Sequence, residues 1–294
     1  MEFLNNLTSP RRVMEIMKKY GIAPNKGLGQ NFLVDGNIAQ AIVKGCRLQE
    51  DDNVLEIGPG LGALTAGMAV AAGRVVAVEI DKGFIPVLQD NLQGFDNVEI
   101  INMDIMKMDL KDVVRTRFGG RPFKVVGNLP YYLTTPIIMK LLEQQLPITT
   151  MVFMIQKEVG QRLSARPSTK EYGALTLAVG YYTDCEVLFK VPNTVFIPRP
   201  KVDSIVIRLT PKAQKNLKPK DERLMFRIIR AAFEQRRKTL VNALAHGGIL
   251  GGDKERIRQV LKGLDIGPES RGEQLTLEQY CKKADNIYGL QKLP

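Results

Sequence analysis

Short runs of apolar residues alternate with amphipathic stretches along the first 210 residues of the chain. An unbroken run of β-branched and other apolar residues is typical of a strand buried on both faces of a sheet. Such runs predict seven strands, over residues 54–57, 74–80, 98–102, 123–126, 151–155, 185–191 and 204–209. Helical periodicity separates most of them, and the last two strands follow one another directly. This order predicts an α/β fold with a doubly wound, mostly parallel seven-stranded sheet.

Helical segments flank the predicted sheet on both sides in sequence. Ser9 followed by Pro10 is a typical helix start and predicts an N-terminal helical extension, which a polar, glycine-rich loop over 25–33 follows. Residues 210–220 contain prolines and lysines and are interpreted as a linker. Beyond it, apolar periodicity predicts helices over 221–244, from 253 to about 263, and after Thr276. We therefore predict a first domain over 1–210 and a small all-helical domain over 211–294.

The net charge of the chain is +11, and most of the excess lies in its last quarter. Residues 211–294 hold 18 Lys and Arg against 10 Asp and Glu, whereas residues 1–210 hold 24 against 21. A basic segment of this kind favours a nucleic-acid partner over a merely solvated helix face.

Other compositional features argue against metal and membrane partners. Three isolated cysteines and a single histidine, His246, give no metal-ligand spacing, so no metal is expected. No apolar run approaches the roughly 18 residues that cross a bilayer. Residues 1–6 lack the features of a signal or transit peptide. We expect a cytoplasmic protein with no membrane partner.

A glycine-rich turn follows the first predicted strand. Gly58-Pro59-Gly60-Leu61-Gly62 stands between strand 54–57 and a helix, an arrangement that lets backbone approach a nucleotide-like ligand. Glu79 ends the next strand, at the spacing that suits hydrogen bonds from ribose hydroxyls. Asp104 follows the third strand, where it either accepts from an adenine amino group or only caps the next turn. A single adenosyl ligand fits better than NAD, because no second βαβ half is evident.

The segment Asn128-Leu129-Pro130-Tyr131 follows the strand over 123–126. An amide oxygen accepts from an exocyclic amine, and an aromatic ring stacks on the base that carries it, so the segment suits an enzyme that holds a nucleobase. An ordinary strand-to-helix turn is the alternative. Phe196 is either a buried anchor or a second aromatic wall opposite Tyr131.

Cationic residues in two places are candidate nucleic-acid contacts. Arg199 and Lys201 follow Phe196 and are placed to bind backbone phosphates. Arg236, Arg237 and Lys238 form a basic block on the helix predicted over 221–244.

Taken together, these motifs resemble a known family. The segments are Gly29-Gln30-Asn31-Phe32-Leu33, Glu56-Ile57-Gly58-Pro59-Gly60-Leu61-Gly62, Val78-Glu79-Ile80-Asp81, Asn128-Leu129-Pro130-Tyr131 and Phe196-x-Pro-x-Pro-x-Val-Asp-Ser204. In this order they are similar to the rRNA adenine N6-methyltransferase family, and within it to the bacterial 16S rRNA adenine dimethyltransferases. The resemblance runs from about Lys26 to Leu209, and the Arg271–Thr276 stretch extends it.

The resemblance implies a Rossmann-like class I methyltransferase that uses S-adenosyl-L-methionine and releases S-adenosyl-L-homocysteine. It implies dimethylation of two adjacent adenines in the 3′-terminal hairpin loop of 16S rRNA, late in the biogenesis of the small ribosomal subunit. A monomer acting on the subunit or its precursor is expected, with the basic helical domain contacting rRNA. By motif position, the implied cofactor contacts are Asn31, Leu33, Gly58, Gly60, Glu79, Asp104 and Asn128.

The same resemblance gives roles to the Asn128 turn. The target amine would donate to the Asn128 side chain and to the carbonyl of Leu129 or Pro130, while Tyr131 and Phe196 stack on the base. Two other functions are weighed against this one. They are methylation of 23S rRNA by a macrolide-resistance enzyme and a non-catalytic role in small-subunit assembly. A mitochondrial relative that serves transcription is a more distant alternative.

Overall fold

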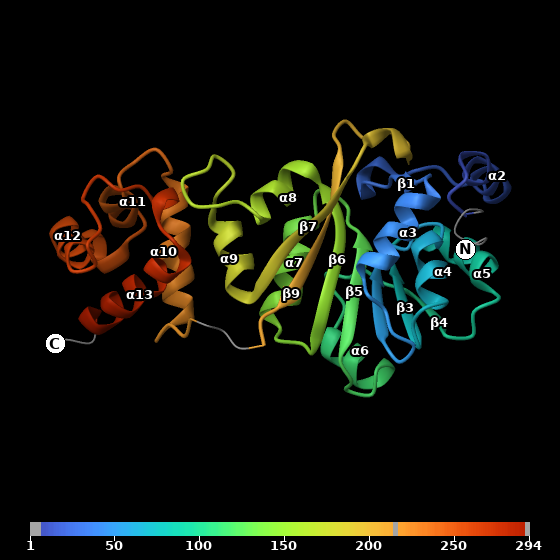
Figure 1. The fold of residues 1–294 in the computed structure, drawn as a ribbon, viewed down its shortest axis with the longest axis horizontal. Coiled ribbons are helices and arrows are strands. Elements are labelled where there is room, and N and C mark those ends of the chain that lie inside the picture. The colour runs from blue at the N-terminus through green and yellow to red at the C-terminus, as the bar shows by residue number, and fades with distance from the viewer. Residues whose placement is uncertain (1–6, 214–216, 292–294) are drawn as a thin grey trace. The chain divides into compact units, whose positions relative to one another are not determined.

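The computed structural model describes residues 7–213 and 217–291. Residues 1–6, 292–294 and positions 214–216 of the predicted linker lie outside the described residues, so the expectation drawn from residues 1–6 has no structural counterpart. The chain divides into two compact units, Met1–Gly160 with Cys185–Pro211 and Gln161–Asp184 with Lys212–Pro294. Figure 1 shows the strands gathered in the first unit and helices α10 to α13 in the second.

The first unit contains the predicted seven-stranded sheet, in the order β4-β3-β2-β5-β6-β9-β7. Its strands are β2 (Asn53–Ile57), β3 (Arg74–Glu79), β4 (Val98–Asn102), β5 (Phe123–Asn128), β6 (Ile148–Gln156), β7 (Thr183–Val191) and β9 (Ser204–Pro211). The pairs β4-β3, β3-β2, β2-β5 and β5-β6 are parallel, and β9 runs antiparallel to β6. The predicted Rossmann-like α/β fold is therefore confirmed.

Helices precede the first of these strands and lie between most of the others. They are α2 (Pro10–Tyr20), α3 (Gly36–Gly45), α4 (Ala63–Ala69), α5 (Ile85–Leu92), α6 (Leu110–Arg117), α7 (Thr134–Glu143) and α8 (Lys157–Leu163), which spans the division between the units. Ile42 of α3 and Met68 of α4 share one apolar cluster with Val54, Val126 and Val152 of the sheet. Unbroken apolar strands are thus buried under helices, as their composition predicts.

A second, two-stranded sheet is absent from the sequence prediction. Phe32–Leu33 forms β1, which pairs antiparallel with β8 (Phe196–Ile197), and Leu33 lies opposite Phe196. Both residues are buried, although 25–33 was expected to be a polar loop. The pairing of β1 with β8 holds this loop in place, so that the apolar side chains of Leu33 and Phe196 pack in the core.

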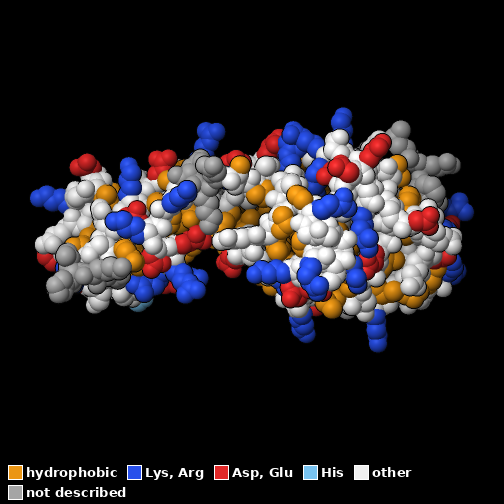
Figure 2. Space-filling model, turned by 90° about the horizontal axis from the view of Figure 1, so that it is seen from below, with side chains coloured by type: hydrophobic (Ala, Val, Ile, Leu, Met, Phe, Trp, Pro, Cys, Tyr) orange, Lys and Arg blue, Asp and Glu red, His pale blue; other side chains and the backbone are white. Residues whose placement is uncertain are grey.

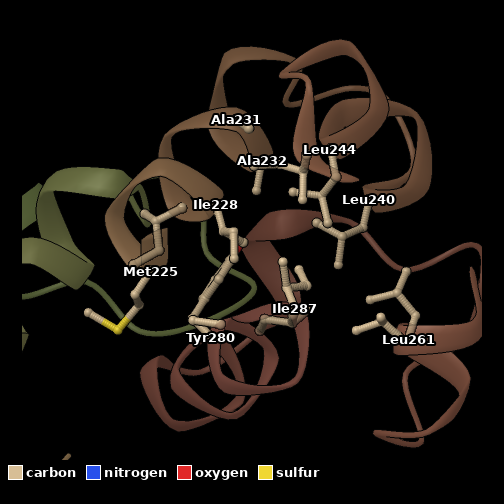
Figure 3. Packing of buried hydrophobic residues seen from close by; sticks show 14 of the residues in the cluster. Met225, Ile228, Ala231, Ala232, Leu240, Leu244, Leu261, Tyr280 and Ile287 are labelled. Atoms are coloured by element: carbon tan, nitrogen blue, oxygen red, sulfur yellow. The ribbon is translucent and has the colours of Figure 1, made fainter. Parts of the chain in front are cut away.

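The second unit is helical. It contains α9 (Ala174–Tyr182), α10 (Glu222–Glu234), α11 (Leu240–His246), η4 (Ile249–Gly252), α12 (Lys254–Lys262), η5 (Gly272–Gln274) and α13 (Leu277–Gln291). Figure 3 shows apolar side chains of α10, α11, α12 and α13 pointing toward one another in its core. The predicted helix starts are confirmed at Asp253, which caps the N-terminus of α12, and at Thr276, which precedes α13. The Thr276 amide N–H donates to the Gln279 side chain at 2.9 Å.

Two features of this unit differ from the prediction. Residues 161–184 belong with it rather than with residues 1–160, because Tyr172 and Tyr181 are buried in its core and the Tyr172 hydroxyl donates to the Leu275 carbonyl at 2.8 Å. The helix predicted over 221–244 is also interrupted. It ends at Glu234, and a new helix begins at Leu240 with Thr239 at its N-cap position, so the basic block lies in a turn.

Candidate functional site

A cavity lies at the carboxyl ends of β2, β3, β5 and β6, where the order of the strands reverses direction between β2 and β5. Ligands of open α/β sheets bind at this kind of switch point. The cavity encloses about 950 Å³ of empty space, which includes its open mouth. Nine predicted site residues line it: Asn31, Leu33, Gly58, Gly60, Glu79, Asn128, Leu129, Pro130 and Tyr131.

The glycine turn forms one wall of the cavity from bare backbone. Gly58 and Gly60 have φ angles of 70° and 58°, a region that L side chains rarely adopt. The Gly58 amide donates to the Val78 carbonyl of β3 at 3.0 Å, which ties the turn to the neighbouring strand. A Cβ on Gly60 would stand 3.4 Å from the Phe32 ring. Glycine therefore keeps this wall open to a ligand.

Glu79 is fixed at the end of β3 by the backbone around it. Its carboxylate accepts from the Gly60 amide at 3.3 Å and from the Asp81 amide at 2.9 Å. Burial raises the pKa of this carboxyl, and the amide donors oppose the rise. A carboxylate offers about four acceptor positions, so positions remain for hydroxyl donors of a ligand.

Asn31 and Asn128 both line the cavity and are hydrogen-bonded to each other. The Asn128 Nδ2 group donates to the Asn31 carbonyl at 3.1 Å. Beside it, Gln30 Nε2 donates to Asp81 at 2.9 Å and holds the loop near the end of β3. Because the amino side of the Asn128 amide faces Asn31, its oxygen Oδ1 faces the other way and is oriented to accept a hydrogen bond.

The turn after Asn128 is held by backbone contacts. The Leu129 amide donates to the Met154 carbonyl of β6 at 3.1 Å. The Pro130 carbonyl accepts both the Leu133 amide, at 3.0 Å, and the Thr134 hydroxyl, at 3.1 Å. A carbonyl has two lone pairs, so Pro130 has no acceptor left. Of the two carbonyls predicted to receive the target amine, Leu129 is therefore favoured.

Tyr131 is half-buried at the cavity wall. Its hydroxyl lies 3.0 Å from the Oγ of Ser204, which begins β9 and is itself buried. Burial raises the pKa of Tyr131, so the phenol is neutral at physiological pH. This hydrogen bond fixes the position of the phenol oxygen and so keeps the ring at the cavity wall.

Asp104 and Phe196 do not line the cavity. Asp104 stands just beyond Asn102, the register partner of Glu79, and its Oδ1 accepts the Met106 amide at 2.8 Å. This cap occupies one of its two carboxylate oxygens. Phe196 is 3% exposed and packs in the apolar cluster that includes Leu33. Its position is that of the buried anchor, one of the two interpretations of its sequence.

The side chains predicted to contact RNA differ in their solvent exposure and in their hydrogen bonds within the protein. Arg237, Lys238 and Lys201 are exposed. Arg199 is also exposed, and its Nε donates to Asn193 at 2.9 Å. Figure 2 shows cationic side chains interspersed with acidic ones on the visible face, without one continuous basic block.

Arg236 is bound within the protein. Its Nε donates to Glu273 at 2.7 Å, and its Nη2 donates to the Thr169 carbonyl at 3.1 Å. It therefore joins three segments of the helical unit, a contact between distant residues that adjacency to Arg237 and Lys238 does not reveal.

Glu56 is a cavity residue that was not assigned a role from the sequence. It is 1% exposed on β2, and its carboxyl group accepts from the Thr65 hydroxyl at 2.5 Å. Burial raises its pKa to about 8, with a contribution from the nearby Glu79 carboxylate, so it is mostly protonated at neutral pH. The signal in the sequence that could have identified Glu56 as a cavity residue is its position directly before Ile57 and the glycine turn.

Neither a metal-ion site nor a membrane-spanning helix is found among the described residues. Within 7–213 and 217–291, no group of three or more His, Cys, Asp or Glu side chains is placed to hold a metal ion. In the same ranges, no helix has the length and apolar character needed to cross a membrane.

The sheet order, the glycine turn after β2 and the acidic residue ending β3 define a Rossmann-like methyltransferase fold. The sequence model of one family, described as ribosomal RNA adenine dimethylase, matches residues 22–286, and the chain belongs to this family. It is therefore an enzyme of the methyltransferase class, as predicted.

Individual proteins agree with this assignment. A ribosomal RNA small subunit methyltransferase A from Alkaliphilus metalliredigens is 48% identical over 278 residues, which are 95% of this chain and 96% of that protein. A crystal structure of a dimethyladenosine transferase from Plasmodium falciparum is 25% identical with a TM-score of 0.76, covering 88% of this chain and 98% of that one. The 23S rRNA methyltransferase ErmE is 26% identical with a TM-score of 0.67, covering 87% and 99%.

Proposed function

We propose that the protein transfers methyl groups from S-adenosylmethionine to the N6 atoms of two adjacent adenines in 16S rRNA. The target is the 3′-terminal hairpin loop, in the small ribosomal subunit or its precursor, and each adenine receives two methyl groups. The observation that carries this proposal is the orientation of Asn128, whose amide oxygen is turned away from Asn31 in a cavity that Tyr131 also lines. We propose that the protein acts on this partner in the cytoplasm and as a monomer.

The cavity suits an adenosyl donor. The bare turn at Gly58 and Gly60 leaves space for its methionine end, together with Asn31 and Leu33. Glu79 presents buried carboxylate oxygens that would accept from the ribose hydroxyls. Asp104, at the end of the neighbouring strand, would accept from the adenine amino group. When bound, the donor supplies an electrophilic methyl carbon on its sulfonium, so the protein mainly positions the reactants.

The residues of the Asn128 turn would orient the target amine. The lone pair of an aromatic amine is delocalised into its ring, which makes the nitrogen a poor nucleophile. Donation of its two N–H groups to Asn128 Oδ1 and to the Leu129 carbonyl would favour a pyramidal nitrogen. Tyr131, held by Ser204, would stack on the extruded base and contribute about 1–3 kcal/mol. The proton then leaves to water, and S-adenosylhomocysteine is the product.

The remaining predicted contacts, those of Phe196 and of the cationic residues, concern the protein with RNA bound. Phe196 would supply a second ring only if its side chain left the cluster around Leu33, so we propose Tyr131 as the principal stacking residue. The exposed Arg199, Lys201, Arg237 and Lys238 would contact phosphates, whereas Arg236 stabilises the helical unit.

Two alternatives receive less support. A 23S rRNA methyltransferase shares the fold, but ErmE is 26% identical to this chain, against 48% for the small subunit methyltransferase. A non-catalytic assembly factor does not need a preserved donor site, whereas here Glu79 and Asn128 both line an open cavity. An assembly role is compatible with catalysis.

The test is to incubate the protein with methyl-labelled donor and small subunits that lack the modification. We expect label as N6,N6-dimethyladenine at two adjacent positions near the 3′ end of 16S rRNA, and none on matched large subunits. Label on 23S rRNA would support the first alternative. Binding to small subunits without any transfer would support the second.

A further inference from the structure

Lys140 of α7 binds three backbone carbonyls of a single loop. Its Nζ donates to the carbonyl oxygens of Ile105, Met106 and Met108, each at 2.8 Å. An ammonium group has three donors and no acceptor, so these three bonds use all of its protons. A lysine in this geometry closes the loop as a bound cation would.

The loop that Lys140 closes begins at Asp104. The Asp104 carbonyl accepts the Lys107 amide at 2.9 Å and the Met108 amide at 3.1 Å, and its Oδ1 accepts the Met106 amide at 2.8 Å. These bonds turn the carbonyls of the loop toward one point. Without a cation there, carbonyl dipoles of like orientation would face one another, so the loop depends on Lys140 for this conformation.

The helix that carries Lys140 starts at the Asn128 turn. Thr134, the first residue of α7, donates its hydroxyl to Pro130, and Lys140 follows less than two turns later. One short helix therefore connects the turn proposed to hold the target base with the loop that carries Asp104.

We propose that Lys140 is a positioning residue that sets specificity for the adenine of the methyl donor by holding Asp104 in place. The inference rests on the proposed function, because it takes Asp104 as the acceptor of the adenine amino group. Burial lowers the pKa of Lys140, while the carboxylates of Asp104 and Asp109 oppose that change.

The test compares two ligands that differ at one position of the base. S-Adenosylhomocysteine carries the exocyclic amine, and its 6-deamino purine analogue has only a C–H group there, which cannot replace the N–H donor to Asp104. We expect the full-length wild-type protein to prefer the first by about tenfold or more in calorimetric titrations. In Lys140→Met, we expect the affinity for S-adenosylhomocysteine to fall about tenfold and the preference to fall below about threefold.

Lys124→Met is the matched control. Lys124 also donates to a backbone carbonyl, that of Arg47, and to Asp52, both at 2.6 Å, but it lies near the amino end of β5, away from the cavity. We expect it to lower the melting temperature and to leave the ligand preference intact.

The possible failures are distinguishable. An unchanged preference in Lys140→Met overturns the role of Lys140, even if the overall affinity falls. An equal loss of preference in Lys124→Met also overturns it, because the preference would then follow stability. These titrations contain no RNA, so a failure to methylate 16S rRNA counts against the proposed function and leaves the binding result interpretable. A wild-type protein that binds neither ligand contradicts the proposed donor itself.

Discussion

Replacing Asn128 by alanine removes the oxygen that we propose accepts from the target amine, and it leaves the other residues that line the donor cavity in place. Each hydrogen bond between neutral groups contributes about 0.5–1.5 kcal/mol to stability, so the loss of the bond to Asn31 lowers the free energy of unfolding by about 1 kcal/mol. Removing one preorganised hydrogen bond from a transition state costs about 2.7–4 kcal/mol, which is about 100–1000-fold in kcat. The expected effect on rate is therefore much larger than the effect on stability.

The assay is a single-turnover methyl transfer to unmethylated small subunits at saturating donor, together with calorimetry of S-adenosylhomocysteine. We expect Asn128→Ala to lose about 100-fold or more in rate while the donor product binds within a few-fold of wild type. Asn97→Ala is the matched control, because Asn97 also donates its amide to backbone carbonyls, those of Ala69 and Ala72 at 2.9 Å, outside the cavity. Near wild-type transfer by Asn128→Ala would refute the role given to the amide oxygen.

Three further predictions concern the donor, the pH and the RNA. Glu79→Gln places an amide N–H₂ where two backbone donors now meet a carboxylate, so the affinity for S-adenosylhomocysteine should fall about 10–100-fold; unchanged binding in calorimetry would exclude Glu79 as the ribose acceptor. The pKa of Glu56 is raised to about 8 in the folded protein, so the folded state binds the extra proton and the stability contribution is lost as the pH rises from about 4.5 to about 8. Glu56→Gln, which mimics the protonated form, should therefore raise the melting temperature more at pH 8.5 than at pH 5.5, and an equal effect at both would count against burial of the charge as the cause. Changing Arg237 and Lys238 to alanine should weaken binding to small subunits and reduce the slope of log affinity against log salt by about 1.5–2, whereas Arg236→Ala should mainly lower the melting temperature; an unaltered slope in the double variant would place both side chains outside the interface.

The features predicted well from the sequence are those that neighbouring residues determine. The strand before Gly58, the acidic end of the next strand at Glu79 and the cap at Asp253 each depend on residues close in sequence. Their hydrogen bonds and backbone angles follow from local residue types.

The features that were missed depend on contacts between distant parts of the chain. The pairing of Leu33 with Phe196 buries a ring that the local pattern of prolines also allows at a surface. Arg236 looks like its basic neighbours until Glu273 is brought beside it, and Lys140 looks like any exposed helix lysine. Periodicity also continued through the break after Glu234, because residues 233, 240 and 244 remain in phase along an uninterrupted helix.

A crystal structure of the protein with S-adenosylhomocysteine tests the central claim most directly. The account predicts the ribose hydroxyls within hydrogen-bonding distance of Glu79 and the base beside Asp104. It also predicts the sulfur on the side of Asn128 that faces away from Asn31. A structure in which the ligand lies elsewhere, with the space between Gly58 and Asn128 filled by the protein's own side chains, would contradict it.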